Sequence, residues 1–259
     1  MRRSEFAWLA RAGLVARGVV YGVIGLLAIK VAAGSGGGTP NQQGALQTIA
    51  HQSFGKVLLV AVAGGLAGYA VWRLVRAAIG HGSQDTESGF DRVAAAASGL
   101  AYAALCAIAV KILTVGSSAG GSSAPKTATA GVLGWTGGTV IVAIAGLTLI
   151  GVALYQGYKG LAQKFLEDTN TGAMSPAVRR AYTAIAAVGH LARMVVFGLT
   201  GYGLLAAAIN YDPRRAVGLD GALNELANRP YGPLLLGIVA AGLIAFGLYS
   251  IVDARYRRV

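Results

Sequence analysis

The chain has 259 residues, of which 55% are apolar and only 12% are charged, and it contains 39 glycines and one cysteine. Soluble domains carry roughly 25% charged residues, so this composition excludes an ordinary soluble domain, a disordered tail and a disulfide scaffold. The formal net charge of +12 comes from bases at the ends of apolar segments. It therefore indicates membrane topology and contact with anionic lipids, and not a nucleic-acid partner.

Six apolar segments are long enough to span a bilayer, which takes about 20 residues for a core ~30 Å thick. In chain order they lie near 14–33, 56–79, 93–115, 138–158, 184–209 and 233–252. The first segment has no small-residue cleavage site followed by a polar mature chain, so we expect a retained helix and no cleaved signal peptide. Loops rich in glycine and serine, 34–43 and 116–127, alternate with the charged connectors 80–92 and 159–183.

Basic residues predict the orientation, because Lys and Arg near helix ends resist translocation. Fifteen of the 22 bases fall on one side: Arg2, Arg3, Arg11, Arg17, Arg73, Arg76, Arg92, Lys159, Lys164, Arg179, Arg180, Arg193, Arg255, Arg257 and Arg258. We therefore expect a multi-pass membrane protein with both termini in the cytoplasm, which for a bacterial protein means the cytoplasmic (inner) membrane.

The chain repeats one two-helix unit three times. Residues 13–34 match 189–210, with Gly13, Ala16, Arg17, Val19, Val20, Gly22, Gly25 and Ala32 recurring as Gly189, Ala192, Arg193, Val195, Val196, Gly198, Gly201 and Ala208. GALQTIAHQSFG (44–55) likewise matches GALNELANRPYG (221–232), and the middle unit keeps Gly99, Tyr102, Lys111, Gly138 and Tyr155 at corresponding places. The repeats are 1–80, 91–165 and 184–259, within a single membrane domain.

Two spans per unit make the repeats parallel, because each unit enters the membrane from the same side. The predicted fold is all-α: six transmembrane helices as three tandem helix pairs in a pseudo-threefold bundle. Gly18, Gly22, Gly25 and their relatives are expected to let helix backbones approach closely. ALQTIA and ALNELA are expected to form short helices at the outer interface.

These motifs resemble a bacterial integral-membrane family, a domain of unknown function, defined by a hydrophobic helix pair present three times. The carrying motifs are the Arg-Gly-Val-Val-Tyr-Gly type of first helix and the Gly-Ala-Leu…Phe/Tyr-Gly entry to the second, and they extend over nearly the whole chain. The resemblance implies the architecture and no activity.

Arg17 and Arg193 occupy equivalent positions, and Ser98 takes that position in the middle unit. Each precedes by four residues an aromatic on the same helical face: Tyr21, Phe197 and Tyr102. Two interpretations stay open. The arginines reach out to cytoplasmic headgroups, or they face the bundle interior and hold an anion or lipid phosphate. On the latter view Arg17, Arg193, Ser98, Tyr21 and Tyr102 are the candidate binding residues.

Asp253 stands where the sister units have Arg76 and Lys159, at the end of a second-helix stripe. A carboxylate near a helix C-terminus meets an unfavourable dipole, so we expect a cationic partner, either Arg193 or Arg17. The alternative is a solvated carboxylate beside the arginines that follow it. Lys30 and Lys111, in the outer parts of the first and third spans, are expected to reach the outer headgroups, with a binding role between repeats as the alternative.

No catalytic, metal or cofactor pattern stands out. Histidines 51, 81 and 190 lie in unrelated places, GSGGG lacks the Lys-Ser/Thr of a Walker loop, and Cys106 is expected to pack within a span. We therefore expect a protein that is not an enzyme. Two functions remain: binding or passing a small anion, solute or lipid between repeats, or a structural role in packing with a partner, in a homo-oligomer, or in organising lipid.

Overall fold

The computed structural model describes residues 3–35, 40–79, 89–116 and 124–257, and six long helices dominate it. They are α1 (Arg3–Ala32), α3 (Gly55–Ile79), α4 (Gly89–Val115), α6 (Gly138–Leu161), α7 (Pro176–Ile209) and α9 (Gly232–Tyr256). Each contains a stretch long and apolar enough to span a membrane, which confirms the six predicted spans. At 1.5 Å per residue the 34 residues of α7 extend about 51 Å, well beyond a hydrocarbon core of ~30 Å.

A short helix precedes the second long helix of every repeat: α2 (Gln42–Ala50), α5 (Ala124–Leu133) and α8 (Leu219–Ala227). The predicted short helices at ALQTIA and ALNELA are confirmed, whereas α5 includes residues that were predicted as loop. Each tight turn that follows ends on a glycine. A Cβ at Gly55, Gly138 or Gly232 would collide with the backbone carbonyl of Ala50, Val132 or Ala227. The parts of the predicted loops and connectors at 36–39, 80–88 and 117–123 lie outside the described residues.

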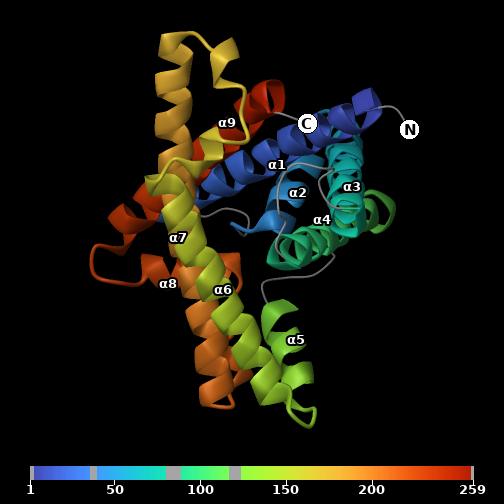
Figure 1. Cartoon of the computed structure of the whole chain (residues 1–259). Coiled ribbons are helices and arrows are strands. Elements are labelled where there is room, and N and C mark those ends of the chain that lie inside the picture. The colour runs from blue at the N-terminus through green and yellow to red at the C-terminus, as the bar shows by residue number, and fades with distance from the viewer. Residues whose placement is uncertain (1–2, 36–39, 80–88, 117–123, 258–259) are drawn as a thin grey trace.

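The most extensive helix packing joins different repeats: α1 with α9, α3 with α4, and α6 with α7. Figure 1 shows α1 and α9 side by side, α4 grouped with α3, and α6 grouped with α7. All three pairs are antiparallel, so the start of α1 lies beside the end of α9. We call this end of the bundle, where the first and last helices begin and end, the terminal end. Because each repeat contributes one helix to each of two interfaces, the interfaces follow the cyclic order of a pseudo-threefold arrangement.

The three interfaces use the same contact at the same repeat position. A Cβ at Gly25 would lie 2.8 Å from Ala240 O, a Cβ at Gly201 would lie 2.8 Å from Gly146 O, and Cys106 Sγ donates to Ala63 O at 3.5 Å. In each case the first-helix residue meets a second-helix carbonyl. Cys106 thus takes a glycine's place in the middle repeat and bonds the carbonyl that glycine elsewhere approaches.

Large and small side chains alternate at a second position of these interfaces. Gly18 faces Ile251, Gly99 faces Leu74, and in the third interface the order is reversed, with Met194 on the first helix facing Gly157. Each interface therefore pairs one glycine with one large side chain, and the interfaces differ only in which helix carries the glycine. Close packing of this kind stabilises helix pairs in a bilayer, where lipid tails are as apolar as the helices themselves.

Within a repeat, two helices pack only where glycine lies on the facing sides. Gly13 meets Tyr69 and Gly189 meets Phe246, while a Cβ at Gly65 or Gly242 would lie 2.8 or 2.5 Å from Ala16 or Ala192 Cβ. In the middle repeat the corresponding residues are Ala94 and Thr148. Along the residues that the structure describes, α4 and α6 share no extended contact. The ring of six helices is therefore open between α4 and α6, which the expectation of three similar helix pairs did not foresee.

The glycine contacts predict a sharp difference between two neighbouring substitutions in α1. Gly25→Ala places a Cβ 2.5 Å from Ile244 Cγ1 and 2.8 Å from Ala240 O, so it should lower the free energy of unfolding by about 2 kcal/mol. Gly22→Ala meets nothing within 4 Å and should be neutral or slightly stabilising. Unfolding of the purified protein by SDS in mixed micelles measures both, and equal effects would contradict the proposed close approach of α1 and α9.

Candidate functional site

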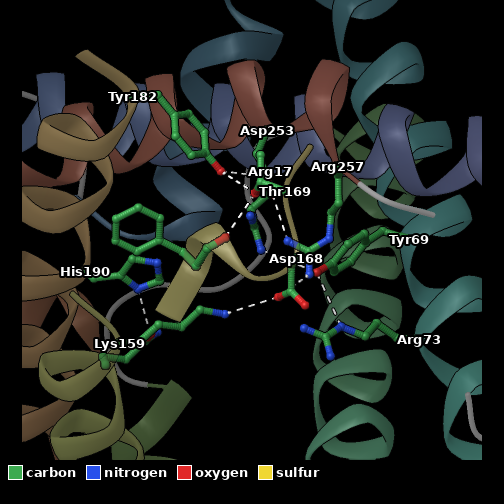
Figure 2. A network of polar contacts seen from close by, with 12 residues as sticks. Arg17, Tyr69, Arg73, Lys159, Asp168, Thr169, Tyr182, His190, Asp253 and Arg257 are labelled. Atoms are coloured by element: carbon green, nitrogen blue, oxygen red, sulfur yellow. Dashed lines mark hydrogen bonds and ion pairs between the residues drawn. The ribbon is translucent and has the colours of Figure 1, made fainter. Parts of the chain in front are cut away.

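Arg17 lies inside the bundle, with 8% of its surface exposed. Its Nε donates to Ser250 Oγ at 3.1 Å and its Nη1 to Tyr69 OH at 3.3 Å, and its guanidinium carbon lies 5.1 Å from the centre of the Phe246 ring. Figure 2 shows Arg17 among side chains from several helices. Arg17 therefore faces the bundle interior, and the interpretation that it reaches out to cytoplasmic headgroups is wrong.

Arg193 is half-buried and enclosed by aromatic rings. Its guanidinium carbon lies 4.4 Å from the ring centre of Phe246, 4.8 Å from that of Phe197 and 5.4 Å from that of Tyr21. The hydrogen-bond network assigns the Gln156 amide: its oxygen accepts from Arg193 Nη1 at 2.9 Å, and its nitrogen donates to His190 Nδ1 at 2.9 Å. The expected approach of Arg193 to Phe197 is confirmed. Tyr21, however, contacts Arg193 of the third repeat, and not Arg17, which precedes it by four residues on α1.

The Arg17–Ser250 and Arg193–Gln156 pairs are the same pair of positions in two different interfaces. In the third interface those positions carry Ser98 on α4 and Arg73 on α3, so each interface has one arginine and one uncharged polar residue. Arg73 Nε donates to Tyr69 OH at 3.3 Å, and Tyr69 thus accepts from arginines of two helices. Sequence reasoning missed Ser250, Gln156 and Arg73, although the repeat register placed all three at one position.

Of the remaining candidates, Tyr102 on α4 packs edge-on against Tyr69, with ring centres 4.6 Å apart. Ser98 is half-buried and takes no part in the hydrogen bonds of Arg17 or Arg193. The structure therefore places Tyr21 directly against Arg193, joins Tyr102 to Arg17 through Tyr69, and leaves Ser98 outside these contacts. Lys30 and Lys111 are exposed and lie apart from this cluster.

The two interior arginines share one aromatic ring, and their hydrogen bonds go to uncharged side chains. Both guanidiniums lie over Phe246, and among the described residues no ion pair joins Arg17 or Arg193 to an acidic side chain. A cation inside a membrane protein is costly unless it is paired or hydrogen-bonded. Neutral hydroxyl, amide and ring partners reduce that cost without cancelling the charge. The arrangement can therefore hold an anionic group between repeats.

A small cavity lies beside Arg193. It has a volume of about 150 Å³. Its lining comes from the long helices α1, α6, α7 and α9 and from the entry to α2 and α8: Tyr21, Gln42, Leu149, Arg193, Val196, Phe197, Thr200, Leu219 and Leu243. The polar lining residues are Arg193, Gln42, Tyr21 and Thr200, so the cavity combines an apolar wall with hydrogen-bond donors.

Asp253 is fully buried near the end of α9, and its cationic partner is Arg257. Arg257 Nη1 donates to Asp253 Oδ2 at 2.8 Å, while Tyr182 OH and Thr169 Oγ1 donate to Oδ1 at 2.9 and 3.3 Å. The prediction of a pair with Arg193 or Arg17 is therefore wrong, as is the solvated alternative. Arg257 follows Asp253 by four residues, about one helical turn, and its side chain bonds the carboxylate. Arg17 instead bonds Ser250 and Tyr69.

The connector after α6 folds back over the terminal end and joins this network. Arg257 Nη2 donates to Asp168 Oδ2 at 3.2 Å, Lys159 Nζ lies 3.6 Å from the same oxygen, and Asn170 N donates to Tyr256 O at 2.8 Å. Burial disfavours a charged Arg257, yet the carboxylates of Asp253 and Asp168 hold its pKa above the usual value. The network, drawn in Figure 2, ties α6, α7 and α9 together at one end.

Removing the buried charge should destabilise the terminal end. Asp253→Asn leaves Arg257 without its fully buried counter-charge and should cost about 3 kcal/mol of unfolding free energy, by SDS titration as above. Asp212→Asn is the matched control, because that carboxylate pairs with the exposed Arg214 at 3.0 Å between α7 and α8, and it should leave stability unchanged. A stability equal to wild type in both variants would refute the structural role of the Asp253 pair.

Comparison with known proteins agrees with the repeat. The family model described as Domain of Unknown Function (DUF1206) matches three times, at residues 12–80, 93–163 and 188–257. The uncharacterised protein YxxB of Bacillus subtilis (strain 168) is 33% identical over 253 residues, which cover 96% of this chain and 90% of that protein. No solved structure matches significantly. The chain therefore belongs to the DUF1206 family, as a multi-pass membrane protein with three copies of the family's helix-pair domain.

Proposed function

We propose that the protein binds an anionic group, a small anion or the headgroup of an anionic lipid, at Arg17 and Arg193 between its repeats. The observation that supports this most strongly is the pair of guanidiniums over one Phe246 ring without an acidic partner among the described residues. A bound anion would supply the missing counter-charge. Arginine suits this role because its planar donors match phosphate and carboxylate oxygens.

The protein performs this role without catalysis, in the bacterial cytoplasmic membrane, with the terminal end in the cytoplasm. The concentration of bases on that side supports the orientation. Among the described residues no three His, Cys, Asp or Glu side chains gather as a metal site, and the proposed chemistry needs none. The arginines bind, and the aromatic rings around them exclude water and strengthen the electrostatic attraction.

A structural role is the second candidate. The close backbone approaches at Gly25, Cys106 and Gly201 join the three repeats tightly, as expected of a protein that organises lipid or packs with a membrane partner or another copy of itself. In that case the arginines serve only to hold the helices together through Ser250, Gln156 and the rings. The two functions differ in whether the arginines carry a ligand.

Native mass spectrometry of the gently extracted protein distinguishes them. The Arg17→Gln/Arg193→Gln variant should retain at least tenfold less of any anionic species than wild type, because each charge-assisted contact contributes about 1.5–3 kcal/mol. Lys30→Gln/Lys111→Gln is the control, since it removes the same formal charge from exposed sites and should retain the wild-type amount. Equal retention in all three proteins would favour the structural role.

A further inference from the structure

Within the described residues, the ring of helices around the arginines is interrupted between α4 and α6. Contacts join α1 to α3, α3 to α4, α6 to α7, α7 to α9 and α9 to α1, but no extended contact joins α4 to α6 along their described residues. In Figure 1, α4 remains with α3 and α6 with α7. The opening lies in the apolar part of the molecule, because both bordering helices contain a predicted membrane span. It therefore faces the bilayer.

The faces that border this opening are those that are buried in the sister repeats. Tyr155 on α6 is 55% exposed, whereas Tyr249, at the equivalent position of α9, is 2% exposed. Thr148 replaces a packed glycine and is exposed, and its hydroxyl bonds Ile144 O on its own helix at 2.7 Å. On α4, Ala101 is exposed where the equivalent Val20 is buried. Two helix faces that elsewhere pack together are thus left uncovered.

Both bordering helices also contact the arginine cluster. Tyr102 on α4 packs against Tyr69, which accepts from Arg17, and Gln156 on α6 accepts from Arg193. Each arginine is therefore one side chain away from a helix that borders the opening. Tyr102 and Gln156 thus connect the two helices that border the opening to Arg17, through Tyr69, and directly to Arg193.

We propose that the ligand of the arginines is an anionic phospholipid that enters from the bilayer through the opening between α4 and α6. This inference rests on the proposed function and names its ligand class. The acyl chains lie against the uncovered apolar faces, and the phosphate bonds the guanidiniums. Lys159 lies in the last turn of α6, and Arg73 lies on α3, which packs against α4; basic residues near the ends of membrane spans attract anionic headgroups. A free anion in water has no need of an opening toward lipid.

The test uses a side chain that fills the opening. Thr148→Trp places an indole on the uncovered face of α6, whereas Leu147→Trp places it on the neighbouring face, where Leu147 is itself exposed. Each protein is incubated in detergent with phosphatidylglycerol, with phosphatidylcholine or with inorganic phosphate, and analysed by native mass spectrometry. We expect wild type and Leu147→Trp to retain phosphatidylglycerol in preference to phosphatidylcholine, and Thr148→Trp to retain at least tenfold less.

A second variant approaches the same question without adding volume. Ala94→Gly/Thr148→Gly restores the two glycines that the sister repeats place between their helices, so α4 and α6 should pack together and close the opening. It too should lose phosphatidylglycerol. Unchanged elution on size exclusion shows that each variant is folded.

The outcomes separate this inference from the proposed function. If inorganic phosphate binds to wild type and Thr148→Trp alike and is lost in Arg17→Gln/Arg193→Gln, the arginine site stands and the lipid inference is overturned. If phosphatidylglycerol is lost in Thr148→Trp but retained in the double-arginine variant, the arginines are not the site and both proposals fall. If Thr148→Trp instead converts a dimer into a monomer, the opening is covered by a second copy and the lipid inference is overturned.

Discussion

Close approach of helix backbones between repeats is the constraint on which the rest of this structure depends. At one repeat position, Gly25, Cys106 and Gly201 each meet a carbonyl of the neighbouring repeat's second helix. In a bilayer the hydrophobic effect cannot drive helices together, so van der Waals contact at small residues has to do so. The three interfaces therefore set the cyclic order of the helices, and this order determines which polar side chains meet inside.

The interior arginines are a consequence of that order. Arg17 reaches Ser250 and Arg193 reaches Gln156 because the same two helix positions face each other in each interface. Both guanidinium groups then lie over the ring of Phe246, from α9. Aromatic faces and neutral acceptors stabilise the interior cations without neutralising them, which is the electrostatic reason for proposing an anionic ligand. The carboxylate of Asp253, in the same part of the structure, is bonded instead by Arg257 and Tyr182.

The sequence predicted the spans and the repeat well, and the contacts of single side chains poorly. Span length and apolar content depend on the bilayer thickness alone, so six helices could be located without a structure. The partner of Asp253 could not be predicted from the sequence, because several arginines were candidates and only the packing of the helices decides which one bonds the carboxylate. Gln156, Ser250 and Arg73 escaped notice because each is an ordinary polar residue by itself. Only their shared place in the repeat marks them.

The sequence by itself determined the membrane class, the three helix-pair units and the equivalence of Arg17 with Arg193, because length, hydropathy and repeated residues are local properties of the chain. Only the tertiary structure decided that the repeats pack mainly with one another, that Arg17 faces inward, and that the middle pair stays apart. The physical reason is that helices meet wherever two small residues face each other. In the middle repeat Ala94 and Thr148 stand at the glycine positions, and α4 and α6 pack against α3 and α7 instead of against each other.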